Sequence, residues 1–294
     1  MAGDDSSRQG RRRGTPGQSP ASGIDTSTAH MARVYDYWLG GENNFPADRD
    51  AARQAMRDFP GIVRGVQAQR GFLTRVVRYL AADVGVRQFL DIGTGLPTAS
   101  NTHEVAQAAA PECRIVYADN DPLVLAHARA LLASSAEGAT DYLDADLRDT
   151  AIILEQAART LDFGRPVAVL LIGILQLIPD EDQPHEIVAR LMSEVPAGSW
   201  LAIAHPTQDL QTSQIAKMAA GLSRRSTTPT TLRTHEAVTR FFDGLDLTDP
   251  PGVLQLDRWA PAAVAPGSGE DIPAYCGLAR KPGPPWLTVV REPW

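Results

Sequence analysis

The stretch 88–101, Q-F-L-D-I-G-T-G-L-P-T-A-S-N, decides the fold of this chain. Its apolar run contains Asp91 near its end, and Gly93 and Gly95 follow where the backbone has to turn sharply. Thr98 then offers a hydroxyl that can cap a helix. This order is typical of the strand, turn and helix that begin an open α/β sheet. A Gly-x-Gly turn alone is weak evidence, so the neighbouring segments have to support it.

Further apolar runs follow at the spacing of a repeated strand and helix. They are R-I-V-Y-A-D (114–119), T-D-Y-L-D-A-D (140–146), P-V-A-V-L-L-I-G (166–173) and S-W-L-A-I-A-H (199–205), and amphipathic stretches over about 99–110, 122–133, 150–159 and 184–194 separate the strands. Strands this apolar on both faces suit the interior of a parallel sheet covered by helices. The sequence therefore predicts a doubly wound, Rossmann-like α/β fold, closed by two more strands at 253–259 and 275–281.

Composition divides the chain into segments. Residues 1–27 are rich in Gly, Ser, Pro and Arg and predict a disordered tail. Apolar residues recur at three- and four-residue spacing over 28–82, which predicts an N-terminal helical layer. The sheet domain is predicted to span 83–281 with a polar, partly helical insertion at 206–242, and a Pro-rich tail follows at 282–294.

Composition also restricts the class of protein. No run approaches the roughly 18 apolar residues of a membrane span, and the polar N-terminus lacks the apolar stretch of a signal peptide, so we expect a cytoplasmic protein. The net charge of −7 disfavours binding to phosphate backbones, and nucleic acid is not expected as a partner. Cys113 and Cys276 lie in strand-like runs away from any metal-ligand spacing, so we expect buried thiols and no metal site.

Three carboxylates follow the first three predicted strands, at the edge where open parallel sheets bind ligands. Asp91 would repel a pyrophosphate, and Thr98 stands where a dinucleotide fold has its third Gly. Asp119 has the position from which a carboxylate accepts both hydroxyls of a ribose, and Asp146 could accept a bond from an adenine amino group while Leu147 packs on the ring. Together they suit a cationic, phosphate-free nucleoside such as S-adenosylmethionine.

The fourth strand leads into V-L-L-I-G-I-L-Q-L-I-P-D-E-D-Q-P, which places 173–178 at the edge of the cleft that faces the transferred methyl. The run lacks the Asp/Asn-Pro-Pro-aromatic sequence that would suggest amino groups of nucleobases or glutamine as acceptors. It resembles instead the corresponding segment of many methyltransferases that act on small molecules.

Taken in order, D-I-G-T-G, Y-A-D-N-D-P, D-A-D-L-R-D and L-L-I-G-I-L-Q-L-I-P-D-E-D resemble the class I S-adenosylmethionine-dependent methyltransferases over about residues 85–205. More narrowly, A-R-V-Y-D-Y-W-L-G-G-E-N-N-F-P-A-D-R-D-A-A at 32–52 is similar to an actinobacterial S-adenosyl methyltransferase family formerly catalogued as a domain of unknown function, and that similarity runs from about 28 to 281. The resemblance implies a seven-stranded sheet with the last strand antiparallel. It implies no known substrate.

The resemblance also implies a cofactor site. It assigns the methionine end to the turn after the first strand, the ribose to Asp119 with Asn120, and the adenine to Asp146 with Leu147. The full predicted set is Asp91, Gly93, Thr94, Gly95, Asn101, Thr102, Asp119, Asn120, Asp146, Leu147 and Gly173. One departure is Gln176, since relatives often carry His in a similar setting.

The candidates on the substrate side are Tyr35, Tyr37, Asn44, Phe45, Gln176 and His205. The first four lie around a Gly40-Gly41 pair that would let the segment fold over the cofactor as a lid. Alternatively, its aromatic residues pack on the sheet edge and Asn44 caps the helix after Pro46. His205 is either a base near the acceptor or a hydrogen-bonded strand end, and the other histidines are expected to be surface or capping residues.

The sequence therefore predicts methyl transfer from S-adenosylmethionine to O, N or C of a small molecule, in secondary metabolism. No catalytic residue is assigned, because an in-line displacement requires mainly positioning. Two alternatives remain open, a regulatory protein that binds the cofactor without turnover and an NAD-dependent dehydrogenase. Asp91 and the absent third Gly argue against the dehydrogenase.

Overall fold

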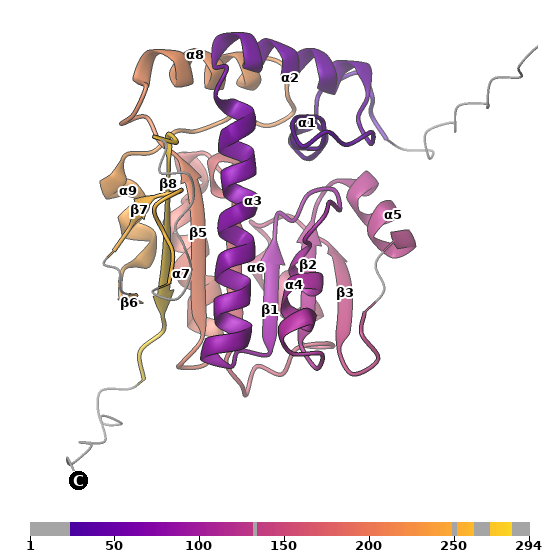
Figure 1. Ribbon diagram of the computed structural model, residues 1–294, viewed down its shortest axis with the longest axis vertical. Coiled ribbons are helices and arrows are strands. Elements are labelled where there is room, and N and C mark those ends of the chain that lie inside the picture. The colour runs from indigo at the N-terminus through magenta and orange to yellow at the C-terminus, as the bar shows by residue number, and fades with distance from the viewer. Residues whose placement is uncertain (1–23, 132–133, 249–251, 262–270, 284–294) are drawn as a thin grey trace, which may run out of the picture.

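A mixed β-sheet forms the centre of the computed structural model, which describes residues 24–131, 134–248, 252–261 and 271–283. The strands run in the order β3-β2-β1-β4-β5-β8-β6, and β7 pairs with β8 (Figure 1). They are β1 (Gln88–Ile92), β2 (Arg114–Asp119), β3 (Ala139–Asp144), β4 (Ala168–Ile172), β5 (Trp200–Pro206), β6 (Asp246–Leu247), β7 (Leu254–Gln255) and β8 (Ala274–Arg280).

Strands β1 to β5 are all parallel, and β8 runs antiparallel beside β5. The α/β prediction is confirmed, including the antiparallel closing strand. Among the described residues the sheet has eight strands where the resemblance implied seven, because the two-residue strands β6 and β7 both pair with β8. The strand order reverses between β1 and β4, and ligands of doubly wound folds bind at such a switch point.

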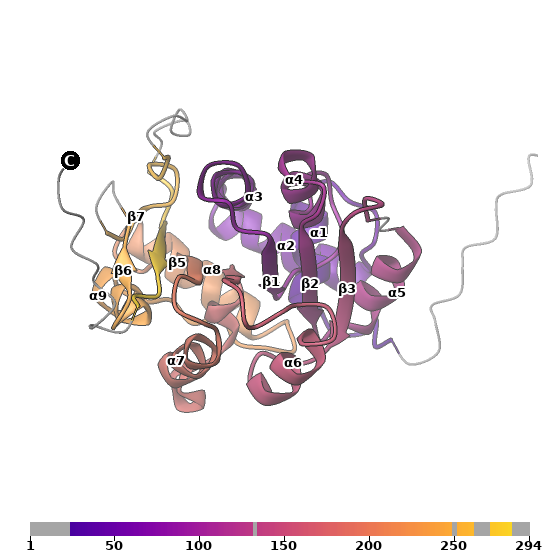
Figure 2. The same ribbon diagram turned by 90° about the horizontal axis from the view of Figure 1, so that it is seen from below.

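Helices cover both faces of the sheet, with α3 and α4 on one face and α6 and α7 on the other (Figure 2). Because both faces are covered, the strand interiors are apolar throughout, as Leu90 and Leu170 illustrate with 0% exposure. The helices are α1 (Met31–Trp38), α2 (Pro46–Asp58), α3 (Ile62–Arg78), α4 (Thr102–Ala109), α5 (Pro122–Leu131), α6 (Thr150–Ala157), α7 (Pro184–Glu194), α8 (Thr212–Ser223) and α9 (His235–Thr239).

The long helix α3 forms because its apolar residues recur at helical spacing. Phe72, Leu73, Val76 and Val77 are buried against β1, β4 and β8 in one core cluster. A π-helical turn, Tyr79–Val84, continues the helix until Gly85 ends it with a φ of 85°. Residues 62–84 of the N-terminal segment are therefore helical.

Helices α1, α2 and α8 lie above the carboxyl ends of the parallel strands (Figure 1). Trp38 of α1 donates its indole N–H to Ala52 O of α2 at 3.3 Å, and both residues belong to the cluster that α8 completes with Ile215 and Met218. Ala29 forms a bridge with Ser226. The N-terminal layer and the 206–242 insertion therefore build one roof over the sheet edge.

The boundary of the predicted N-terminal tail lies too far along the chain. Ile24 packs against Leu96 and Leu123, and the carbonyl of Asp25 accepts a 2.7 Å hydrogen bond from Arg33 Nη1, so these two residues have tertiary partners. The rest of the predicted tails, 1–23 and 284–294, lies outside the described residues.

Within the described part of the chain, no helix is long and apolar enough to cross a membrane. The same residues contain no group of three or more His, Cys, Asp or Glu side chains arranged to hold a metal ion. Cys113 and Cys276 are buried free thiols, as the sequence predicted.

Leu170→Ala tests how tightly this sheet is packed. Leu170 is fully buried in β4, which lies between β1 and β5, so the substitution leaves a cavity and should lower the free energy of unfolding by about 2–5 kcal/mol. Ile152 of α6 is 46% exposed, and Ile152→Ala should change the same quantity by less than about 0.5 kcal/mol. Urea denaturation followed by circular dichroism measures both, and equal losses would contradict this packing.

Candidate functional site

A cleft lies at the carboxyl ends of β1, β2 and β4, beneath α1 and α3. Its floor is the turn Gly93–Gly95 with Asp91 and Asp119, and its roof includes Met31 and Tyr35. A second hollow continues from it past Asp146 and Leu147. The two hollows share His30, Met31, Gly93, Asp119, Asn120, Ile174 and Leu177. The structure therefore brings all three predicted carboxylates to one continuous cleft.

The turn after β1 requires both of its glycines. Gly93 has a φ of 75°, and a Cβ there would lie 2.6 Å from Cβ of Ile174, so only glycine allows the two segments to approach. Gly95 has a φ of 68° and open space where its Cβ would be. Gly93, Thr94 and Gly95 all line the cleft.

Asp91 is 5% exposed, and its Oδ2 accepts a 2.6 Å hydrogen bond from Thr102 Oγ1. Burial raises the pKa of Asp91 to about 6, and the charge of Asp119 adds to the rise, while Thr102 and Arg70 oppose it. The protein thus keeps a carboxylate in a place where its negative charge is poorly solvated. A cation in the cleft would relieve that cost.

Asp119 ends β2 and is buried, which raises its pKa. Its Oδ1 accepts the backbone N–H of Asp121 and its Oδ2 accepts that of Gly95, each at 2.9 Å. These two bonds fix the carboxylate, and the remaining lone pairs are available to a ligand.

Asp146 lies at the far end of the second hollow. Asn120 Nδ2 donates to its Oδ2 at 2.8 Å, and Arg148 donates to its Oδ1 from both the backbone and the guanidinium. Burial alone would raise the pKa of Asp146, but the hydrogen bonds and charge of Arg148 outweigh it and lower the pKa. Leu147 lines the hollow beside it.

Asn101 and Thr102, predicted as cofactor contacts, do not line either hollow. Asn101 begins α4, where its Oδ1 accepts the N–H of Thr98 and its own N–H donates to Glu104. Thr102, which lies outside the lining, donates a hydrogen bond from its hydroxyl to Asp91. Both residues hold the turn and its carboxylate in place.

The end of the cleft under α1 and α3 combines apolar walls with polar groups, of which Tyr35 and Gln69 are neutral and Asp36 and Arg70 are ionisable. Tyr35 lines it and hydrogen-bonds Gln69 and Gln176, and burial raises the pKa of Tyr35 to about 12. Gln176 is buried outside the lining, and its Nε2 also donates to Gly173 O at 2.6 Å. The apolar lining there is Leu39, Val66, Leu73, Ile172 and Leu177.

Three other substrate-side candidates do not line the cleft. Tyr37 lies under Arg53, whose guanidinium is 5.6 Å from its ring centroid. Asn44 does not cap α2 but donates to Asp36 Oδ2 at 2.7 Å, and Asp48 instead accepts the N–H of Phe45. Tyr37 thus packs within the N-terminal layer, whereas Phe45 packs against the cluster of Leu96, Leu123 and Val124.

His205 is fully buried at the end of β5, away from both hollows. Arg233 Nη1 donates to its Nε2 at 2.8 Å, so its Nδ1 carries the proton and donates to Pro206 O at 2.7 Å. Burial and the charge of Arg233 lower the pKa of His205 to about 3. This geometry matches a hydrogen-bonded strand end. Arg233 also donates to the carbonyls of Leu175 and Ile178, so it orders the segment after β4.

Several lining residues were not found from the sequence. Arg70 of α3 lines the cleft near Asp91 and donates to the carbonyls of Ala99 and Ser100. His30, expected on the surface or at a helix end, is the N-cap residue of α1, and it also borders both hollows. A basic residue on a helix that precedes the glycine turn is the signal that could have indicated Arg70.

A family model described as S-adenosyl methyltransferase matches residues 17–282 of the chain. The chain belongs to this family. It is an S-adenosylmethionine-dependent methyltransferase, and S-adenosylmethionine is its cofactor. A comparison with curated proteins found no significant match.

Two solved structures are similar to this methyltransferase over nearly their whole length. A DUF574 family protein from Streptomyces avermitilis is 44% identical, with a TM-score of 0.83 over 88% of this chain and 99% of the other. A methyltransferase candidate from Thermobifida fusca is 36% identical, with a TM-score of 0.81 over 90% of this chain and 99% of the other. An O-methyltransferase family protein from Burkholderia thailandensis, 14% identical with a TM-score of 0.51 over 79% of this chain and 60% of the other, shares the fold.

The charges in the cleft fit this cofactor. Besides Tyr35, the ionisable side chains that line the two hollows are His30, Asp36, Arg70, Asp91, Asp119, Asp146 and Arg148. Arg148 is already paired with Asp146 and Asp182, so carboxylates outnumber the remaining cations. Such a lining favours a ligand with ammonium and sulfonium groups and opposes a pyrophosphate.

In the absence of ligand, the substitution Asp91→Asn should stabilise the protein. Because the pKa of Asp91 is raised to about 6, the folded state binds more protons than the unfolded state between about pH 4 and 6, and stability is lost as pH rises through that window. At pH 7 the free energy of unfolding of the Asn variant should exceed that of wild type by up to about 3 kcal/mol. This gain should vanish below about pH 4. Denaturant unfolding from pH 3.5 to 7.5 measures it.

Asp146→Asn is the matched control, since the pKa of Asp146 is lowered. Its carboxylate contributes stability above the unfolded-state pKa, and that contribution is lost as pH falls through the folded-state pKa. This variant should therefore be less stable than wild type at pH 7. A gain at neutral pH for both variants, or for neither, would contradict the assigned electrostatics.

Proposed function

We propose that this methyltransferase acts on a small molecule that binds in the apolar end of the cleft under α1 and α3. The observation that carries the proposal is the composition of that end, in which Tyr35 and Gln69 are the neutral polar groups among Leu39, Val66 and Leu73. Walls of this kind favour a largely apolar acceptor with a few hydrogen-bonding groups. We also propose that the reaction belongs to secondary metabolism.

We assign the cofactor's parts to the carboxylates along the cleft. Asp91 would accept the methionine ammonium and Arg70 would bind the methionine carboxylate, because these side chains have opposite charges and line the same hollow. Asp119 would accept the ribose hydroxyls beside Asn120. Asp146 and Leu147 would bind the adenine from the second hollow.

When bound, the cofactor supplies a methyl carbon that its positive sulfur activates for displacement. The residues of the chain then mainly hold the acceptor about 3 Å from that carbon and in line with it. Tyr35 stays protonated at neutral pH because its pKa is about 12, and His205 is sealed from the cleft. Neither group is therefore available as a base, and an acceptor that is already nucleophilic, such as an amine or a phenolate, would need none.

Calorimetry with S-adenosylmethionine, S-adenosylhomocysteine and NAD tests the proposed cofactor site. The first two should bind and NAD should not, since the cleft is rich in carboxylates. Binding of NAD alone would contradict the assignment and restore the dehydrogenase alternative. Transfer of labelled methyl groups into a metabolite fraction of cell extract, followed by mass spectrometry of the product, then identifies the acceptor. Tight cofactor binding with no labelled small molecule would contradict the proposed acceptor class.

Arg70→Met should separate the two ends of the cofactor. The variant loses a charge-assisted hydrogen bond to the methionine carboxylate, so S-adenosylhomocysteine should bind about 10- to 100-fold more weakly. 5′-Methylthioadenosine has no carboxylate, and its affinity should change by less than about twofold. Calorimetry measures both ligands, and Arg70→Lys, which keeps the charge, should recover part of the affinity. Equal losses for the two ligands would refute the assignment of Arg70.

A further inference from the structure

We propose that Asp121 is a positioning residue, which holds the N-terminal helical layer and the carboxylate of Asp119 in one fixed arrangement. The inference rests on the proposed role of Asp119 at the cofactor's ribose. It assigns to the layer a second task besides covering the cleft: its correct placement sets the affinity for the nucleoside half of the cofactor.

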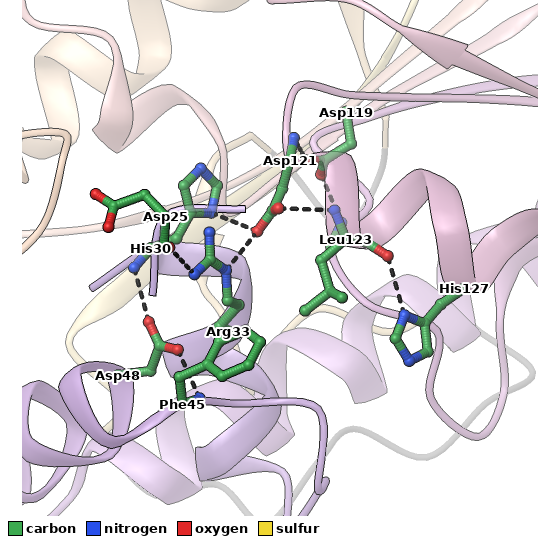
Figure 3. Close-up of polar contacts among 10 residues, drawn as sticks. Asp25, His30, Arg33, Phe45, Asp48, Asp119, Asp121, Leu123 and His127 are labelled. Carbon is green, nitrogen blue, oxygen red and sulfur yellow. Dashed lines mark hydrogen bonds and ion pairs between the residues drawn. The ribbon is translucent and has the colours of Figure 1, made fainter. Parts of the chain in front are cut away.

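Asp121 is completely buried and uses both carboxylate oxygens (Figure 3). Its Oδ2 lies 3.0 Å from Arg33 Nε and 3.0 Å from His30 Nδ1, both from the N-terminal layer. Its Oδ1 accepts the N–H of Leu123 at 2.9 Å, at the start of α5. One side chain therefore joins the layer to the turn after β2.

The backbone of the same residue continues the connection toward the cleft. The N–H of Asp121 donates to Asp119 Oδ1, and Asp119 Oδ2 accepts the N–H of Gly95 (Figure 3 shows the first of these). A displacement of Asp121 would therefore rotate the Asp119 carboxylate or break its bond. The glycine turn that floors the cleft is attached to the other oxygen of the same carboxylate.

The layer's side of this contact is itself part of the cleft. His30 and Met31 line both hollows, and Arg33 is two residues further along α1. Arg33 is 4% exposed, donates to the carbonyl of Asp25 and lies over the ring of Phe45. The cation is thus fixed from three sides, and it can hold Asp121 in one position.

A buried ion pair is a poor way to gain stability, because desolvation offsets much of the attraction and an apolar pair often serves as well. A buried ion pair does fix the relative position of its two side chains, because each buried charge has few possible partners. Burial alone would raise the pKa of Asp121, but His30, the Leu123 amide and Arg33 outweigh it and lower the pKa to about 2. Asp121 therefore stays charged at physiological pH. The charge therefore serves to hold Asp121 in a fixed position relative to Asp119.

The chain offers a matched control at another ion pair of the roof, between α8 and α2. Lys217 of α8 lies 2.8 Å from Asp58, a carboxylate whose side chain is 5% exposed at the end of α2. Neither residue lines the cleft or contacts Asp119. Lys217→Met should loosen the layer against α8 without disturbing the ribose carboxylate.

The experiment is calorimetric titration of wild type, Arg33→Met, Asp121→Asn, the double variant and Lys217→Met. The ligands are S-adenosylhomocysteine, adenosine and 2′,3′-dideoxyadenosine. Arg33→Met and Asp121→Asn should each lower the affinity for S-adenosylhomocysteine by about tenfold or more. The affinity of the double variant should be no lower than that of the single variant with the lower affinity. The preference for adenosine over its dideoxy analogue should fall toward unity in these variants. Lys217→Met should keep both the affinity and the preference within about twofold of wild type.

Two results would overturn the role of Asp121. The first is that Arg33→Met binds S-adenosylhomocysteine and prefers adenosine over its dideoxy analogue as strongly as wild type does. This variant removes the cation that pairs with Asp121, so it remains informative if Asp121→Asn does not fold. The other is an equal loss in Lys217→Met, or an unchanged ribose preference in weakened variants, since either would indicate general loosening. If wild type binds none of the three ligands, the proposed cofactor site fails, and the role of Asp121 fails with it.

Discussion

Two carboxylates buried side by side at the ends of neighbouring parallel strands are the constraint on which this site depends. Asp91 and Asp119 belong to β1 and β2, and burial raises the pKa of both; the charge of Asp119 adds to the rise at Asp91, and that of Asp121 adds to the rise at Asp119. The surrounding contacts hold them nevertheless: Thr102 bonds Asp91, and the amides of Gly95 and Asp121 bond Asp119. In a family that uses S-adenosylmethionine, a cationic cofactor gives the reason for keeping charge at such a place.

Much of this site could be predicted because its carboxylates stand at fixed places relative to strands that the local sequence pattern reveals. Asp91 and Asp119 lie near the ends of two strands and Asp146 just after a third; the spacing of these strands indicated a parallel sheet, whose carboxyl ends must meet at one edge. Positions determined by long-range packing were not predictable. Arg33 pairs with a residue 88 positions away, and no local pattern indicates such a partner.

The same limit explains the misassigned side chains. Asn101 and Thr102 stand next to the glycine turn in sequence, but α4 begins there, so their side chains cap the helix or support Asp91. The segment around Gly40-Gly41 was predicted either to form a lid or to pack its aromatic residues on the sheet edge, and Tyr37 and Trp38 pack within the N-terminal layer. The roof itself joins 28–82 to the 206–242 insertion through Ala29 and Ser226, and this pairing of distant segments has no sequence signature.

The central claim, that the Asp91 carboxylate is kept for a cationic ligand, is tested most directly by following its carboxyl carbon by NMR as pH is varied. The account predicts a pKa of about 6 in the free protein and a fall of about one unit or more when S-adenosylhomocysteine binds, because the ligand's ammonium favours the charged form. An ordinary pKa near 4 in the free protein, or a pKa that saturating ligand leaves unchanged, would contradict it.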